Sequence, residues 1–285
     1  MTIHESEATM RQPLPVENRL SSSAARIPEQ VSQSPGIVVQ GRLLRSFAFT
    51  TDAAIARNTN ADAILAVYPF TGDPTITQAL LSVARAPLFV GVGGGTTTGP
   101  RVIQLAMIAE MQGVSGVVLN APSPTATVYD VSRAVNVPVI ATVTACNGLV
   151  DEKIDAGAAI INVAAGGKTP HVVREIKQRY PLVPLIATGG GTPDSMLETI
   201  ASGADALSWT PPSIAAWQHS AMEHYRCASE GFAMPPQSRH GKHRSPSLYQ
   251  DEPEALLNTR NVSAQTAAST AATGSGCESN QENRR

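Results

Sequence analysis

Residues 184–209 read PLIATGGGTPDSMLETIASGADALSW, and this stretch contains the repeating unit of the fold. It opens with the short apolar run Leu185–Thr188, which follows a proline and stops at three glycines. A segment with apolar residues at helical spacing comes next, and it ends at Gly203 just before a second apolar run, Ala206–Trp209. The order of strand, helix and strand predicts a βαβ unit with parallel strands.

Six further apolar runs precede these two, and each is bounded by glycine or proline. They are Leu43–Phe49, Ala63–Tyr68, Leu88–Val92, Gly116–Asn120, Val139–Val143 and Ala159–Val163. The runs are continuously apolar rather than alternating, which is typical of strands covered by helices. We therefore expect a parallel sheet of eight strands.

Prolines and glycines alternate in front of the later runs. A proline precedes the third, fifth and seventh run, and a glycine precedes the fourth, sixth and eighth: Pro87, Pro138, Pro184, Gly113, Gly157 and Gly203. A repeat of two βα units fits a closed barrel, because its interior layers come from alternate strands. An open doubly wound sheet is the alternative, and it does not require this alternation. The sequence predicts a (β/α)₈ TIM barrel over residues 35–228.

The composition of the chain limits its domain boundaries and its classes of partner. Residues 1–34 and 229–285 are rich in Ser, Gln, Glu and Pro, so we expect disordered tails. The net charge of −2 and an aromatic content of 4% argue against nucleic acid as a partner. The three cysteines are too widely spaced for a disulfide framework or a metal pair. We expect a cytoplasmic protein with no membrane partner and no metal, and homo-oligomerisation stays open.

Ligand sites of such barrels lie in the loops that follow the strands. The seventh run is followed by Gly189, Gly190 and Gly191 and then by a helix start, where free N–H groups favour an anion such as phosphate. The alternative is an ordinary glycine-rich turn in which Thr192 caps the helix.

Two further loops extend this candidate site. Thr210 and Ser213 follow the eighth run and would share the phosphate, although the two prolines between them supply no N–H group. Gly93, Gly94 and Gly95 follow the third run and form either a second anion nest or a mobile loop over the ligand.

Polar residues at the ends of other runs complete the list of candidates. Asn120 and Asn162 end the fourth and sixth runs, and they are candidates to hydrogen-bond a small anionic metabolite. The same holds for three short polar residues at the fifth run: Thr142, Thr144 and Cys146. Lys168 is one of only four lysines, and it would bind an anion or form a Schiff base, unless it is simply solvated. Asp52 is either a general base or the N-cap of a helix.

The stretch from Ile186 to Ser213 resembles the phosphate-binding (β/α)₈ barrels, which include thiamine phosphate synthase and the 2-keto-3-deoxy-6-phosphogluconate aldolases. That resemblance implies a phosphate held after the seventh and eighth strands. A closer resemblance covers residues 41–217. The segments SFAFTTDAAIARNTNADAILAVYPFT, VGVGGGTTTG and VVLNAPSP are similar to a bacterial β/α-barrel family that carries the provisional label "hydrolase".

These residues predict a cofactor-independent enzyme that acts on a small phosphorylated or carboxylated metabolite as a hydrolase, lyase or isomerase. Two alternatives stay open. One is an FMN-dependent oxidoreductase, because the barrels of the nitronate monooxygenase type, which the seventh loop resembles, also use a glycine-rich phosphate turn there. The other is a barrel that binds a ligand without catalysis, because the sequence offers few acid–base pairs.

Overall fold

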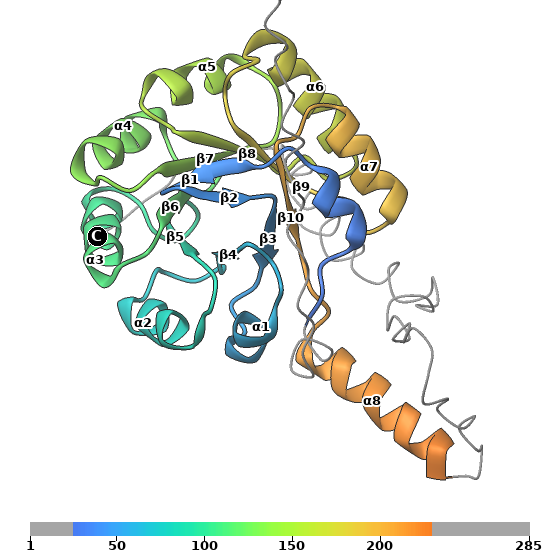
Figure 1. The fold of residues 1–285 in the computed structure, drawn as a ribbon. Coiled ribbons are helices and arrows are strands. Elements are labelled where there is room, and N and C mark those ends of the chain that lie inside the picture. Colours follow the sequence, from blue (N-terminus) through green and yellow to red (C-terminus); the bar gives the residue numbers. More distant parts are fainter. Residues whose placement is uncertain (1–24, 230–285) are drawn as a thin grey trace, which may run out of the picture. The chain divides into compact units, whose positions relative to one another are not determined.

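Eight parallel strands close into a barrel in the computed structural model, which describes residues 25–229 (Figure 1). Each strand pairs with the next along the chain, and the last pairs with the first. The strands are β3 (Ser46–Phe49), β4 (Ala63–Ala66), β5 (Leu88–Gly93), β6 (Gly116–Leu119), β7 (Val139–Val143), β8 (Ile160–Val163), β9 (Leu185–Thr188) and β10 (Ala206–Trp209). The fold is a (β/α)₈ TIM barrel, as predicted.

A helix follows every strand. These helices are α1 (Ala53–Asn58), α2 (Pro74–Val83), α3 (Pro100–Gln112), α4 (Thr125–Ala134), α5 (Gly148–Asp155), α6 (Thr169–Arg179), α7 (Pro193–Ala201) and α8 (Ile214–Ser229). A 3₁₀ turn, η3 (Gly166–Lys168), precedes α6. Because each helix starts where a strand ends, all helix N-termini lie at the same end of the barrel, which we call the mouth. Within residues 25–229, no helix is long and apolar enough to cross a membrane.

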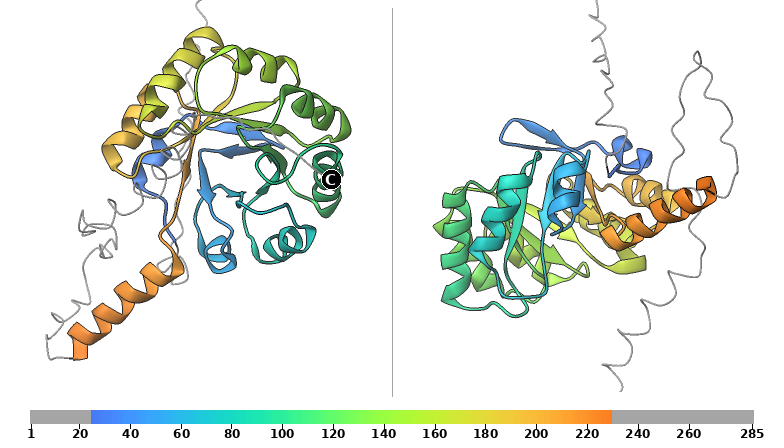
Figure 2. Two further views of the ribbon diagram at one scale, coloured as in Figure 1. Left: turned by 180° about the vertical axis from the view of Figure 1, so that it is seen from behind. Right: turned by 90° about the horizontal axis from the view of Figure 1, so that it is seen from below.

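A hairpin closes the other end of the barrel. Its strands β1 (Ile37–Val39) and β2 (Arg42–Leu44) are antiparallel, and Figure 2 shows the hairpin lying across the barrel end. Ile37, Val39 and Leu44 are buried and pack against the residues that fill the barrel interior. The predicted run Leu43–Phe49 is therefore two strands, because the chain turns at Arg45 from the hairpin into the barrel wall.

The barrel interior is small and filled with side chains at its centre. The rings of Phe47 and Phe89 meet edge to face with centroids 5.4 Å apart. Phe89 occupies space that a side chain on Gly116 would need, since a Cβ there would lie 2.6 Å from the Phe89 ring. The centre is thus a packed core and contains no channel.

The segment before the hairpin is ordered, although the sequence analysis assigned residues 25–34 to a disordered tail. The 3₁₀ helix η2 (Glu29–Gln33) buries Val31 completely in the core between strands and helices. The Ala25 N–H donates to the Asn58 carbonyl at the end of α1. Val31, together with the buried Ala25, the partly buried Ile27 and a few hydrogen bonds, therefore orders a polar stretch. Residues 1–24 and 230–285, which hold the rest of both predicted tails, lie outside the described residues.

Candidate functional site

Five consecutive strands, β6 to β10, end in neutral polar side chains that face the barrel axis at the mouth. These residues are Asn120, Thr142, Asn162, Thr188 and Ser208. Each lies two positions after a residue on the inner face, and side chains two apart in a strand share a face. The preceding inner residues are Val118, Ile140, Ile160, Ile186 and Ala206. We call the five polar residues the polar layer.

The polar layer is incompletely hydrogen-bonded. The Asn162 Nδ2 donates to the Thr142 Oγ1 at 3.2 Å, and the Ser208 Oγ lies 3.4 Å from the Thr188 Oγ1. Asn162 is only 6% exposed, and its Oδ1 has no hydrogen-bond partner. Leaving a buried acceptor unpaired costs about 1–3 kcal/mol, so the mouth offers a ready acceptor for a ligand N–H or O–H group.

The other side of the mouth is apolar. Phe49 on β3 is 37% exposed, and Val67 packs against the inner core just after β4. Gly91 on β5 has no side chain, and a Cβ there would meet Val67 at 3.1 Å. The mouth therefore has a polar half and an apolar half, which suits a small ligand with one edge of each kind.

Lys153 hydrogen-bonds the backbone next to the polar layer. Nothing in the sequence indicates this role. This α5 residue is only 3% exposed, and its Nζ donates to the carbonyls of Thr142 at 3.0 Å and Ala121 at 3.2 Å. The ammonium group thereby ties the loop after β6 to the end of β7. Burial lowers the pKa of Lys153 below its ordinary value.

The lowered pKa of Lys153 predicts a pH dependence of stability. Between the lowered pKa and the ordinary value of 10.5, the unfolded chain binds more protons than the folded chain. The free energy of unfolding should therefore rise with pH across this window. Urea unfolding at successive pH values should show this rise in the wild type and its loss in Lys153→Met. The matched control is Lys168→Met, because Lys168 is exposed; an equal loss in the control would contradict the prediction.

The glycine turn after β9 offers fewer donors than its sequence suggests. Thr192 and Ser195 form a capping box, so the Ser195 N–H already donates to the Thr192 hydroxyl, and Pro193 has no N–H. The Gly189 N–H donates to the Ser208 carbonyl at 3.1 Å. Among the described residues, the amides of Gly190 and Gly191 have no acceptor, so these two N–H groups stay available to an anion.

The alternative reading of this turn, with Thr192 as the N-cap, also agrees with the geometry. Gly190 lies so close to Ser195 that an added Cβ would sit 2.5 Å from the Ser195 Cβ. The missing side chain at Gly190 thus serves the cap, whereas Gly191 has nothing within 4 Å of that position. On the loop after β10, Thr210 is exposed, and the Ser213 Oγ accepts from the Ala216 N–H at 3.2 Å as a cap of α8.

The glycines after β5 form a tight turn beside the polar layer. Gly94 and Gly95 have φ values of +94° and +68°, and the Gly94 N–H donates to the Thr97 carbonyl. A Cβ on Gly94 would lie 2.7 Å from the Asn120 Cβ, and one on Gly93 would lie 2.9 Å from Leu119. The turn therefore needs small residues in order to approach Asn120 closely.

The two predicted catalytic residues lie on the loops, outside the polar layer. Lys168 is exposed at the end of η3. Asp52 caps α1, with its Oδ1 accepting from the N–H groups of Ala54 at 2.8 Å and Ile55 at 3.1 Å. Within residues 25–229, no group of three His, Cys, Asp or Glu side chains is arranged to hold a metal ion.

Substitutions at Asp52 separate its capping role from a chemical one. Asp52→Ala should lower the free energy of unfolding by about 1 kcal/mol, because two N–H groups lose their acceptor. Asp52→Ser should restore most of that loss, because serine caps helices as well as aspartate does. Denaturant unfolding measures both variants. Equal destabilisation of the two would show that the carboxylate does more than cap the helix.

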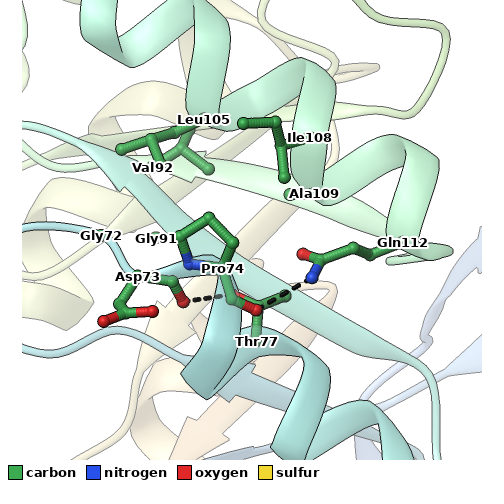
Figure 3. Close-up of a pocket in the computed structure, with 10 residues that line it drawn as sticks. All are labelled: Gly72, Asp73, Pro74, Thr77, Gly91, Val92, Leu105, Ile108, Ala109 and Gln112. Carbon is green, nitrogen blue, oxygen red and sulfur yellow. Dashed lines mark hydrogen bonds between the residues drawn. The ribbon is translucent and has the colours of Figure 1, made fainter.

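A small cavity lies outside the barrel wall between α2 and α3 (Figure 3). Its volume is about 10 Å³, and the buried Gln112 Oε1 beside it has no partner, while the Gln112 Nε2 donates to the Pro74 carbonyl. This space holds about one water molecule. It is too small for a metabolite, so the polar layer is the better candidate for a ligand site.

Comparison with known proteins identifies the fold. No protein-family model matches the chain, and no curated protein matches its sequence. A candidate phosphonomutase from Burkholderia cenocepacia J2315 is similar in structure, with 14% identity, a TM-score of 0.50 and coverage of 65% of this chain and 93% of that one. A mandelate oxidase structure has 16% identity, a TM-score of 0.50 and coverage of 62% and 68%.

A phosphoenolpyruvate phosphomutase from Streptomyces platensis is 16% identical, with a TM-score of 0.48 and coverage of 71% of this chain and 83% of that one. At such identities the similarity concerns the backbone arrangement and does not extend to the reaction. What the comparisons show is that the chain has the fold of the (β/α)₈ barrels.

Proposed function

We propose that this barrel is an enzyme that binds a small phosphorylated or carboxylated metabolite at its mouth. The observation that carries the proposal is the unpaired Oδ1 of Asn162, buried in the polar layer. A buried acceptor without a donor is a destabilising feature, and such features concentrate at functional sites. The mouth is also where barrels of this architecture hold their ligands.

Three parts of the bound metabolite orient it at the mouth. A hydroxyl or amino group donates to the Asn162 Oδ1, and the apolar edge lies toward Phe49 and Val67. The anionic end lies at the rim, where Gly190 and Gly191 have free N–H groups and helix α7 begins. Lys168 follows the adjacent strand and adds a positive charge on that side.

A lyase or isomerase reaction agrees better with these residues than hydrolysis does. Lys168 is an exposed amine on the loop after β8 that can reach a carbonyl group or move a proton. The carboxylate of Asp52 is engaged at the start of α1, which leaves it poorly available to activate water. The hydrolase label therefore has less support than the other two reaction classes.

Binding without turnover is the second candidate, and one observation favours it. None of the five side chains of the polar layer ionises near neutral pH, so the layer itself supplies no acid or base. Loss of a measured turnover in Lys168→Met, with ligand affinity retained, would exclude this candidate.

A thermal-shift screen tests the proposed function. The panel contains sugar phosphates and keto acids, their unphosphorylated or neutral analogues, and FMN. A ligand at about a hundred times its Kd should stabilise the chain by about 2.7 kcal/mol. We expect a shift with anionic metabolites and its loss in Asn162→Leu. A shift that Asn162→Leu retains would contradict the proposed site, and a shift with FMN alone would favour the oxidoreductase.

A further inference from the structure

A second hollow lies at the closed end of the barrel, opposite the mouth. This groove of about 290 Å³ runs between the β1–β2 hairpin and the connections that lead from α2 into β5 and from α3 into β6. The hairpin contributes Gln40, Arg42 and Leu44, and the facing wall contributes Leu81, Arg85 and Ser115. The volume is close to the lower limit of small-molecule sites, which is about 300 Å³.

The groove carries uncompensated positive charge. Arg42 and Arg85 are both exposed and come from opposite walls, and no carboxylate lines the groove. Neither guanidinium has a partner among residues 25–229. Two acids at this end of the barrel are engaged elsewhere, because Asp62 accepts from Ser46 and Asp205 pairs with Lys177 at 2.7 Å.

An apolar floor and an unusual turn complete the groove. Leu44 and Leu88 are buried, and they line the same groove as the two arginines. Gln40 has a φ of +49°, and it is the only residue other than glycine with a positive φ in the described part of the chain. Side chains rarely adopt this conformation, which asparagine and glycine tolerate best. The turn instead places a longer amide side chain at the edge of the groove.

We infer that this groove is a second binding site, for a small dianion that carries a short apolar group, such as a phosphate monoester. Two guanidinium groups from opposite walls suit a phosphate, because each can donate paired hydrogen bonds to its oxygens. The leucine floor receives the apolar group, and Gln40 and Ser115 supply neutral hydrogen bonds at the edge. The site is separate from the polar layer and does not depend on the proposed function.

Phenyl phosphate is a suitable probe, with phenol as its neutral counterpart. Binding to the full chain is measured by ligand-detected NMR and by titration calorimetry. We expect phenyl phosphate to bind and phenol to bind far more weakly. The double variant Arg42→Gln/Arg85→Gln should weaken the binding of phenyl phosphate by about tenfold or more. Raising the salt concentration should weaken it in the wild type.

Two control variants separate this groove from the mouth. Arg101→Gln removes the same kind of charge from the first turn of α3, which lies at the mouth end. Asn162→Leu disables the polar layer. Arg101→Gln should bind phenyl phosphate as the wild type does, and Asn162→Leu should retain the part of the binding that depends on Arg42 and Arg85. Absence of binding to the wild type, equal affinity in the double arginine variant, or a loss confined to Asn162→Leu would each overturn the proposal.

Discussion

Replacing Thr142 with valine and Asn162 with leucine together is expected to make the protein more stable and unable to bind its ligand. The pair share one hydrogen bond, and the Asn162 Oδ1 is buried without a partner. Apolar side chains of similar shape remove the unpaired acceptor and leave no new one. The gain should be about 1–2 kcal/mol, which is about 3–6 °C in melting temperature for a domain of this size.

The single variant Thr142→Val provides the contrast. It leaves the Asn162 amide in place and removes the acceptor of its Nδ2, so it should lower the melting temperature rather than raise it. Thermal unfolding and the ligand screen on the same samples give both readouts. A double variant that is less stable than the wild type would mean that the polar layer is internally satisfied and is not a ligand site.

Gly116→Ala is expected to destabilise the barrel by about 3 kcal/mol, which is the largest loss that we predict for a single methyl group. The added Cβ would lie 2.6 Å from the Phe89 ring and 2.9 Å from the Pro138 carbonyl oxygen. The ring cannot retreat, because it packs against Phe47 at the barrel centre. Denaturant unfolding should show a lower midpoint with an unchanged slope.

Gly191→Ala is the matched control for this substitution. Nothing lies within 4 Å of its Cβ position, and its φ is not positive. Alanine there should leave the free energy of unfolding unchanged or raise it by about 0.4–1 kcal/mol, because alanine lowers the conformational entropy of the unfolded chain. If the two variants lose similar stability, the cause would be the restricted backbone conformation of alanine relative to glycine, and not the crowding around Phe89.

The strands were predictable from the sequence because glycine and proline bound each apolar run. Val139–Val143 and Leu185–Thr188 have the predicted bounds. The hairpin was missed because only Arg45 separates its second strand from β3, with no glycine or proline between the two strands. Residues 25–34 were assigned to a tail because their composition is polar, yet Val31 alone anchors η2 in the core.

The position of the candidate site was predictable from the sequence, but the hydrogen bonding and burial of its side chains were not. Asn120 and Asn162 stand out in the sequence because each is a polar residue at the end of an apolar run, and their binding role stays a prediction. Whether a side chain finds a partner depends on the register between neighbouring strands, which the sequence does not contain. Lys153 has no signal of its own, since a lysine in a helix normally points to water, and its burial depends on the loop after β6.

The β1–β2 hairpin limits how a ligand can reach and leave the polar layer. Ile37, Val39 and Leu44 of the hairpin close one end of the barrel, and the rings of Phe47 and Phe89 fill its centre, which leaves the mouth as the approach to the polar layer. A ligand bound at the polar layer therefore enters and leaves by the same opening, and under the proposed function a bound product excludes the next substrate. If the proposed enzyme forms a single product, as an isomerase does, inhibition by that product should therefore be competitive with the substrate.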